Sequence, residues 1–392
     1  MDIFHKCDGF TAAREAMAAD LYPYFVVLDG HEGTEVRYQG RSVVMCGSNN
    51  YLGLTTDPRV KAASQAATDE FGTSCTGSRF LNGNLALHEQ LERELAAYCG
   101  KEEALVFTTG YQANLGAVSG LVGRGDHVLI DRAAHASAID AAALSGARTR
   151  TFRHDDPASL RRLLRSCPLD AGRLVVVDGV YSMDGDVCSL PELLAECRAF
   201  GARLLLDDAH GIGVLGGGRG TEAHLPGDDE ADLTTLTFSK SLASVGGAVL
   251  GSAQVVHYLR HHARSLIFSA GMSPANTAAA LAALGILREE PWRVERLHEN
   301  AAYLRAGLLD LGIDVGTGTS PIVPVFTADH TETFVLWRRL LDRGVYVNAV
   351  VPPAASHRLR MSVMATHTPD QLDHVLNAFA DVFADRSLAV GA

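Results

Sequence analysis

The central part of the chain alternates between helical and strand-like spacing of its apolar residues. Four segments carry apolar residues at helical spacing, namely 58–71, 85–98, 112–121 and 190–200. Short runs that are apolar almost throughout lie between and after them, at 104–107, 127–130, 174–177, 203–206, 233–238 and 248–250. Because strands that are buried on both faces read as continuous apolar runs, this alternation predicts a mostly parallel sheet with helices on both faces.

The same patterns divide the chain into three parts. Residues 1–55 are predicted to form an N-terminal arm with a short helix near 11–20 and a small hairpin. A large domain is predicted over 56–289, and a smaller C-terminal domain of mixed helices and strands over 290–392. The later elements expected are helices over 274–290, 291–311, 331–343 and 370–385, and strands over 322–326, 345–350 and 359–363.

Composition narrows the class of protein. With 392 residues, 47% of them hydrophobic, the chain is long enough for two cores, and its net charge of −12 argues against nucleic acid or an anionic membrane as a partner. No apolar run reaches the roughly 18–20 residues of a membrane-spanning helix, and no signal peptide is expected. The seven cysteines are an odd number without a C-x-x-C pair, which predicts a cytoplasmic protein without disulfides or a metal site.

Candidate chemistry begins where two predicted strands end. One strand runs directly into Asp207 and Asp208, and another is followed closely by Lys240, one of only four lysines among 34 basic residues. Arginine cannot replace lysine where a primary amine must form a Schiff base. A lysine and a buried acid are the pair that holds pyridoxal 5'-phosphate (PLP), with the acid on the ring nitrogen. A surface lysine and two turn-capping acids are the competing interpretations.

Neighbouring residues extend this hypothesis. Successive side chains of an extended segment point to opposite sides, so one acid of the pair faces the cofactor, and Asp207 is the candidate. His210 can reach the phenolic oxygen of the cofactor. His135 follows the strand over 127–130, where its ring can stack on the cofactor ring. A histidine after a strand is often only a satisfied polar group, and this alternative stays open.

Three further positions suit anionic groups. Gly110 lies where a strand meets a helix, and free N–H groups at a helix N-terminus bind phosphate. Asn49 precedes the first long helix, and Arg360 lies on a strand of the smaller domain, so each is a candidate for holding a substrate carboxylate. A plain turn and a surface arginine are the alternatives for these two.

Taken together, these motifs resemble those of the α-oxoamine synthases, a family of PLP-dependent acyltransferases. The resemblance spans residues 22 to about 380 in family order. It rests on Ser48-Asn-Asn-Tyr-Leu-Gly-Leu54, Gly77-Ser-Arg-Phe-Leu-Asn-Gly83, Thr109-Gly-Tyr-Gln-Ala-Asn-Leu115, His135-Ala-Ser137, Gly179-Val-Tyr-Ser-Met-Asp-Gly-Asp186, Asp207-Asp-Ala-His-Gly211, Gly218-Arg-Gly220, Thr237-Phe-Ser-Lys240 and His367-Thr-Pro369. It implies an α/β protein of PLP fold type I, like aspartate aminotransferase, with a large and a small domain.

The resemblance also assigns roles to single residues. The catalytic group it implies is Lys240, His135, Asp207 and His210. The cofactor-binding group adds Gly110, Tyr111, Ser182, Thr237, Ser239 and Ser269, with Ser269 reaching the phosphate from the neighbouring subunit of a homodimer. Asn49 and Arg360 match the positions that hold the amino-acid carboxylate.

The activity implied is decarboxylative condensation of a small amino acid with an acyl thioester of coenzyme A or a carrier protein. Gly344-Val-Tyr-Val-Asn348 is similar to serine palmitoyltransferases, whereas Val351 stands where those enzymes usually carry an arginine. Serine, glycine and alanine therefore stay open as substrates. The alternatives are a glycine C-acetyltransferase-like or 8-amino-7-oxononanoate synthase-like enzyme, an aminotransferase, or a non-catalytic subunit.

Overall fold

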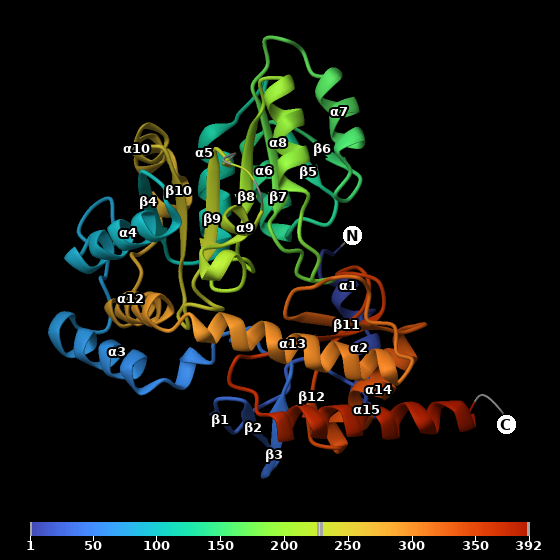
Figure 1. Ribbon diagram of the computed structural model, residues 1–392. Helices are drawn as coiled ribbons and strands as arrows, with labels where there is room; N and C mark the ends of the chain where they lie inside the picture. Colours follow the sequence, from blue (N-terminus) through green and yellow to red (C-terminus); the bar gives the residue numbers. More distant parts are fainter. Residues whose placement is uncertain (1, 226, 228–229, 390–392) are drawn as a thin grey trace.

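The protein is described from a computed structural model that covers residues 2–225, 227 and 230–389 (Figure 1). A large sheet flanked by helices forms one half, and two smaller sheets with long helices form the other. Helix α13 (Trp292–Asp310) runs along the boundary between the halves (Figure 1). Within the described ranges, no helix is long and apolar enough to cross a membrane.

The large sheet carries the strands that were predicted from apolar runs. Its order is β4-β10-β9-β8-β7-β5-β6 within the described residues. Strand β10 is antiparallel to both neighbours and the other neighbouring pairs are parallel, so the prediction of a mostly parallel sheet is confirmed. The strands are β4 (Glu103–Phe107), β5 (His127–Asp131), β6 (Arg148–Phe152), β7 (Arg173–Asp178), β8 (Arg203–Asp207), β9 (Leu233–Thr237) and β10 (Gly247–Gly251).

Helices cover both faces of this sheet because successive strand residues point in opposite directions. In β7, Leu174 and Val176 pack into one core cluster, and Val175 and Val177 pack into another. The first cluster is completed by α5 (Gly110–Leu121), α6 (Ala136–Ser145), α10 (Ala253–His262) and α11 (Arg264–Ile267). The second cluster is completed by α7 (Pro157–Arg165) and α8 (Leu190–Ala199). A third cluster contains residues of β4, β9 and β10 and is completed by α3 (Pro58–Phe71), α4 (Ala86–Cys99) and α12 (Pro274–Glu289).

Local signals set the ends of several helices. The Asp57 side chain accepts a hydrogen bond from the Arg59 N–H, and Pro58 begins α3. Ser273 caps α12 in the same way, with Pro274 as its first residue. Such caps satisfy N–H groups that have no partner inside the helix. The predicted starts of these two helices, at 58 and 274, therefore agree with the structure.

The second half contains two small sheets. Strands β11 (Ile322–Phe326), β14 (Arg358–Ser362) and β13 (Asn348–Val350) form one, and β1 (Gly30–Glu32), β2 (Glu35–Tyr38), β3 (Arg41–Met45) and β12 (Val345–Tyr346) form the other. The prediction of a single strand over 345–350 is wrong, because β12 pairs with β3 and β13 pairs with β14. The buried Val347 keeps the apolar pattern continuous where the chain passes from one sheet to the other.

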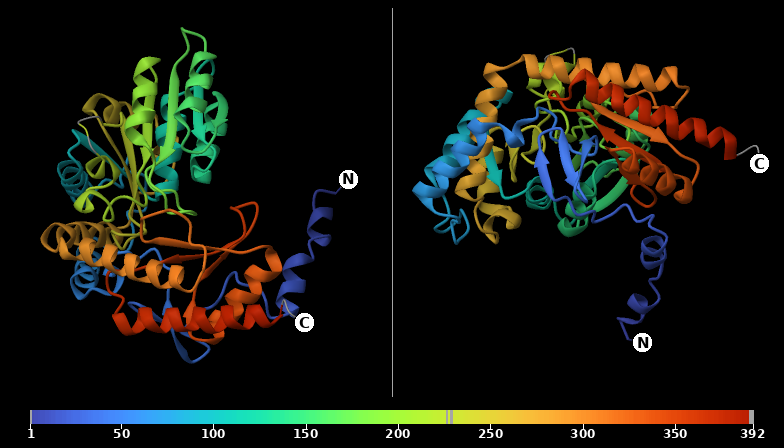
Figure 2. Two further views of the ribbon diagram at one scale, coloured as in Figure 1. Left: turned by 45° about the vertical axis from the view of Figure 1, so that its right-hand side comes forward. Right: turned by 90° about the horizontal axis from the view of Figure 1, so that it is seen from below.

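The N-terminal strands share a core with the C-terminal residues. Val36, Val43 and Val44 pack in one cluster with buried residues of the segment 301–382. Helices α14 (His330–Asp342) and α15 (Pro369–Ala389) complete this half. Before the strands, α1 (His5–Asp8) and α2 (Ala12–Ala18) extend away from the body (Figure 2). The predicted domain boundaries stay a prediction.

Some elements are absent from the predicted set. Strand β6 reads Arg-Thr-Arg-Thr-Phe and exposes most of its side chains, so it lacks an apolar run. Helices α6, α7 and α10 were not predicted either, and neither were the short elements η1 (Leu54–Thr56), η2 (Gly216–Gly218), α9 (Thr221–His224) and α11. The short elements and the edge strand bury too few residues to produce a clear period, whereas α7 does bury Leu160 and Leu164 at helical spacing.

A buried acid joins two loops at the edge of the large sheet. Asp131, at the end of β5, accepts hydrogen bonds from Tyr181 Oη at 2.9 Å and from His154 Nδ1 at 3.1 Å. His154 Nε2 lies 2.8 Å from Asp186 Oδ2, so the imidazole bridges two carboxylates. Hydrogen bonds to Asp131 and then to Asp186 raise the pKa of His154 to about 10. A cationic His154, in the loop after β6, therefore ties the end of β5 to the segment 181–186.

We expect His154→Gln to destabilise the fold more at low pH than at high pH. The folded-state pKa lies above the unfolded value of about 6.5, so this stabilisation is complete below pH 6.5 and is lost as the pH rises through about 10. Urea unfolding at pH 6 should show a loss of about 1.5–3 kcal/mol, typical of hydrogen bonds to charged groups. The difference from the native protein should shrink by pH 10. A difference that is the same at both pH values would contradict the assignment.

Candidate active site

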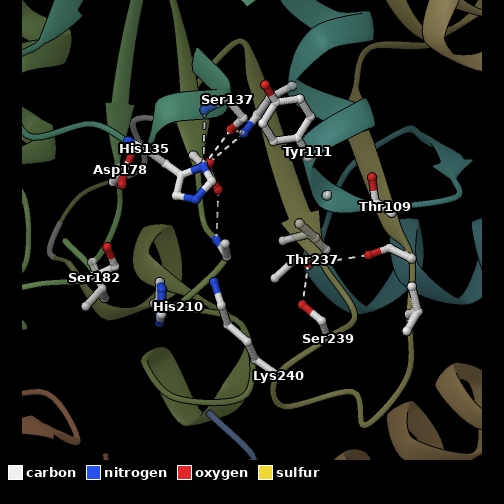
Figure 3. Close-up of a pocket in the computed structure, with 18 residues that line it drawn as sticks. Thr109, Tyr111, His135, Ser137, Asp178, Ser182, His210, Thr237, Ser239 and Lys240 are labelled. Atoms are coloured by element: carbon white, nitrogen blue, oxygen red, sulfur yellow. Dashed lines mark hydrogen bonds between the residues drawn. The ribbon is translucent and has the colours of Figure 1, made fainter. Parts of the chain in front are cut away.

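The residues proposed from the sequence meet where the parallel strands end. Loops that follow β4, β5, β7, β8 and β9 surround a cavity of about 290 Å³ (Figure 3). This volume is close to the lower end of small-molecule pockets, which begin at about 300 Å³. The cavity is lined by Thr109, Gly110, Tyr111, Asn114, His135, Ser137, Asp178, Val180, Ser182, Asp207, Ala209, His210, Leu236, Thr237, Ser239, Lys240, Val245 and Gly246. Ligands in open α/β sheets bind at this edge.

Lys240 presents its amine to the cavity from the turn after β9. In Figure 3 the side chain points toward the centre of the pocket, with His210 on one side and Thr237 and Ser239 on the other. Burial lowers the pKa of Lys240 to about 8, although the nearby Asp207 acts in the opposite direction. A lysine with this pKa is neutral in a substantial fraction near physiological pH, as a nucleophile or a proton acceptor must be.

Two carboxyl groups lie side by side at the ends of adjacent strands. Asp178 of β7 and Asp207 of β8 are paired in register. Burial and the neighbouring Asp207 raise the pKa of Asp178 well above its usual value. Asp207 accepts a hydrogen bond from Asn114 Nδ2 at 2.6 Å and another from the Ala209 N–H at 3.1 Å. These donors favour the carboxylate form of Asp207, whereas burial beside Asp207 favours the protonated form of Asp178.

The neighbouring Asp208 points away from the cavity, as the alternation of an extended chain predicted. It accepts hydrogen bonds from the hydroxyl of Thr221 at 2.6 Å and from its backbone N–H at 3.0 Å. Burial raises the pKa of Asp208 to about 7. Of the two acids, Asp207 lines the cavity and Asp208 connects the chain after β8 to α9.

His210 is held by a tyrosine that lies outside the cavity lining. Its Nδ1 lies 2.7 Å from the hydroxyl of Tyr51, and both side chains are buried. Burial, and next the charge of Lys240, lower the pKa of His210 well below its usual value, so the ring is neutral. Burial also raises the pKa of Tyr51. The Tyr51 hydroxyl is also placed to donate to Asn49 Oδ1, at 3.5 Å. Tyr51 occupies Nδ1 of His210, which leaves Nε2 as the ring nitrogen open to another partner.

The other end of the cavity is built to accept an anion. Helix α5 begins at Gly110, and Thr109 caps it by accepting a hydrogen bond from the Gln112 N–H at 3.1 Å. The hydroxyls of Thr237 and Ser239 lie 2.9 Å apart beside this helix start (Figure 3). A side chain at Gly110 would place its Cβ 2.8 Å from Thr237, so only glycine fits. Free N–H groups, a helix dipole and hydroxyls are together suited to phosphate.

Arg360 and Asn49 lie next to the cavity rather than in its lining. The guanidinium of Arg360 donates from Nε to the Ser182 carbonyl at 2.5 Å and from Nη1 to Asn49 Oδ1 at 3.1 Å. Arg360 is buried, and among the residues that the structure describes no carboxylate lies within ion-pairing distance of it. A buried cation with only neutral partners is suited to an incoming carboxylate.

Ser269 is the remaining predicted residue, and it lies outside the cavity lining. Its hydroxyl accepts a hydrogen bond from Gln112 Nε2 at 2.9 Å, close to the start of α5. The predicted contact with a phosphate across a dimer interface stays a prediction.

The structure adds cavity residues to which sequence reasoning gave no role, although Thr109 and Asp178 lie at strand ends where a ligand was expected. Asn114, Ser137 and Thr109 line the cavity, and so does Asp178. Asn114 and Ser137 occur inside the quoted motifs, but a polar residue within a helix gives no sign of where it points. No group of three or more metal-binding side chains occurs in the described part of the chain.

Known proteins are similar to this chain over most of its length, in sequence and in structure. A family model for class I and II aminotransferases matches residues 41–379. A serine palmitoyltransferase from Sphingobacterium spiritivorum is 45% identical over 96% of this chain and 96% of its own length. An 8-amino-7-oxononanoate synthase from Methylococcus capsulatus is 41% identical over 95% of this chain and 98% of its own. A solved structure of SPT with a PLP internal aldimine is 36% identical, covers all of both chains and has a TM-score of 0.95.

The chain therefore belongs to the class I and II aminotransferase family and, within it, to the α-oxoamine synthases. The predicted fold class, an α/β protein of PLP fold type I, is confirmed by the same comparisons.

We expect the amine of Lys240 to react with acetic anhydride at a lower pH than an ordinary lysine does. Only the neutral amine is acylated, so labelling should rise with pH and reach half its maximum near pH 8, instead of near 10.5. Peptide mass mapping of the cofactor-free protein separates Lys240 from Lys6, Lys61 and Lys101. Half-maximal labelling of Lys240 above pH 10 would show that burial does not lower its pKa.

Proposed function

We propose that the protein is a PLP-dependent acyltransferase. It condenses a small L-amino acid with an acyl thioester and gives an α-aminoketone, CO2 and a free thiol. The observation that carries the proposal is the half-buried Lys240, whose amine faces a cavity that is also lined by the Asp207 carboxylate and by a site suited to phosphate. The names of the relatives, serine palmitoyltransferase and 8-amino-7-oxononanoate synthase, support the same class of reaction.

The residues of the cavity fit PLP by the chemistry of their groups. Lys240 offers a primary amine to the cofactor aldehyde, and Asp207 offers a carboxylate to the ring nitrogen. Gly110 and Tyr111 at the start of α5, with the hydroxyls of Thr237 and Ser239, are suited to hold the phosphate. When bound, PLP supplies an electron sink for the electrons released at the α carbon of the amino acid.

Lys240 has two tasks in this proposal. Its neutral amine would bind the cofactor aldehyde covalently. When free, the same amine is suited to remove the α proton of the amino acid, for which a pKa of about 8 is well matched. Its position at the centre of the cavity lets the same Nζ atom return a proton to the product (Figure 3).

The other polar residues orient the reactants. His135 lies on the side of the pocket away from Lys240 and is suited to stack on the ring (Figure 3). Nε2 of His210, the ring nitrogen that Tyr51 leaves open, is suited to contact the phenolic oxygen, and Ser182 lines the same cavity. Arg360, with Asn49, is suited to bind the carboxylate of the amino acid.

The amino acid and the acyl group are less sharply defined by these residues. Serine is favoured by the 45% identity to a serine palmitoyltransferase. Val351, in place of the usual arginine, and the 41% identity to an 8-amino-7-oxononanoate synthase favour glycine or alanine with a different acyl chain. The thioester is carried by coenzyme A or by a carrier protein.

A homodimer in the cytoplasm is the state we propose for the enzyme. Leu81 and Phe268, which are 80% and 70% exposed, belong to segments joined beside the start of α5. Exposed apolar residues of this kind at the rim of a site favour burial against a second subunit. The cysteines of the described residues are free thiols, which is consistent with a reducing compartment.

We expect the purified protein, incubated with PLP, serine, glycine or alanine, and an acyl-CoA, to release CO2 and form an α-aminoketone that mass spectrometry identifies. Borohydride reduction should fix PLP on the peptide that contains Lys240. Lys240→Ala should fold but lose both the covalent cofactor and the condensation, because it removes the only amine in the cavity lining among the described residues. An oxoacid formed without CO2 would indicate an aminotransferase. Failure to bind PLP at all would indicate a non-catalytic subunit.

We expect Asp207→Asn to weaken PLP binding by about 10- to 150-fold, because a charge-assisted hydrogen bond contributes roughly 1.5–3 kcal/mol. The value of kcat should fall by about 10²–10³-fold, as for the loss of other preorganised electrostatic groups. Titration of the cofactor-free protein with PLP measures the first effect and steady-state kinetics the second. Asp208→Asn is the matched control, because this acid points away from the cavity. Near-normal kinetics for Asp207→Asn would assign the ring nitrogen to Asp178.

A further inference from the structure

One buried amide is linked to both of the groups that the proposed function places against the cofactor ring, to Asp207 directly and to His135 through Ser137. Asn114 lies one turn into α5, and its side chain is nine-tenths or more buried, with only 3% exposed. It also lines the cavity. An amide in such a position destabilises the fold unless its donors and acceptor are hydrogen-bonded. The amide of Asn114 is hydrogen-bonded to three side chains, those of Ser137, Asp207 and Thr235.

Three hydrogen bonds define the orientation of this amide. The hydroxyl of Thr235, in β9, donates to Asn114 Oδ1 at 2.8 Å. On the other side, Asn114 Nδ2 donates to Asp207 Oδ2 at 2.6 Å and to Ser137 Oγ at 2.8 Å. An amide turned by 180° would place its oxygen against the carboxylate, so Thr235 and Asp207 together allow a single orientation.

The chain of hydrogen bonds continues from Asn114 through Ser137 to His135. Because Ser137 Oγ accepts from Asn114, its own proton is available to His135 Nδ1, which lies 2.8 Å away. The backbone N–H of Ser137 also points at Nδ1, at 3.3 Å. Two donors therefore meet Nδ1, which must be an acceptor. The ring of His135 thus carries its proton on Nε2.

From this chain of donors we propose that Asn114 is a positioning residue for the cofactor site. It holds the Asp207 carboxylate in place for the ring nitrogen, and through Ser137 it sets the rotation and the protonated nitrogen of the His135 imidazole. This inference rests on the proposed function, because PLP is the ligand toward which both groups are oriented. Asn114 itself does not need to touch the reacting atoms.

Asn114→Leu and Asn114→Asp test the proposal by titration of the cofactor-free protein with PLP. The leucine variant keeps a similar volume without hydrogen bonds, and the aspartate variant sets a second carboxylate against Asp207. We expect the dissociation constant of PLP to rise by about 10- to 100-fold in both variants, since a charged group loses its partner. Asn300→Asp is the matched control, because Asn300 is also buried but bonds only backbone carbonyls away from the cavity. It should lower the melting temperature without a comparable loss of PLP affinity.

Thr235→Val provides a second, milder test should the Asn114 variants not fold. It keeps the shape of Thr235 but removes the hydroxyl that fixes the amide, so the PLP dissociation constant should rise by about 2- to 10-fold. Nitrogen-15 NMR of histidine-labelled, cofactor-free protein gives a readout that needs no PLP. The native protein should show a neutral His135 with its proton on Nε2, assigned by comparison with His135→Gln, and Ser137→Ala should shift its Nδ1 signal.

Unchanged PLP affinity in Thr235→Val and in the Asn114 variants would overturn the inference, and so would a native His135 with its proton on Nδ1. Equal losses of affinity in Asn114→Asp and Asn300→Asp would also overturn it, because the effect would then follow from stability alone. If the native protein does not bind PLP, the proposed function fails instead. The NMR result for His135 would still decide whether the chain of donors exists.

Discussion

The interaction on which the site depends is the one between a half-buried amine and a buried carboxylate at neighbouring strand ends. Lys240 and Asp207 both lose water on folding, and each buried charge destabilises the fold unless other groups offset that loss. Asp207 is stabilised as an anion by two N–H donors. Lys240 adjusts in a different way, because burial lowers its pKa to about 8 and favours the neutral amine. This difference suits Asp207 to the proposed role of ionic anchor and Lys240 to that of nucleophile.

The parallel sheet explains why so many functional groups meet in one cavity. Parallel strands direct their carboxyl ends to the same edge, and each loop that follows a strand contributes one or two side chains. The helix that starts at Gly110 adds its positive end at the same edge. The smaller half contributes Arg360, whose hydrogen bond to the Ser182 carbonyl joins the two halves beside the cavity. The arginine that we propose for binding the substrate carboxylate therefore also holds the two halves together.

Much of the fold could be predicted, because buried strands and long amphipathic helices leave strong periodic patterns. The start of α12 at Pro274 and the strands β4 to β9 that read as apolar runs are of this kind. The pattern was insufficient where burial does not follow the element, as in the exposed strand β6 and at the buried Val347, where the chain changes sheets. The same limit applies to Asn114, since a helix period does not indicate which polar residue lies against a carboxylate.

The amino-acid sequence by itself determined which chemical groups are available: a rare lysine, an acid at a strand end, two histidines and a glycine at a helix start. Local rules were sufficient for these, because strand ends, caps and alternation depend on neighbouring residues. Only the tertiary structure decided which of these groups meet and in which ionised form. Asn114, Ser137 and His135 are joined by hydrogen bonds, and Asp178 reaches Asp207 from another strand. Such contacts, and the loss of water that shifts pKa values, exist only after distant segments have packed together.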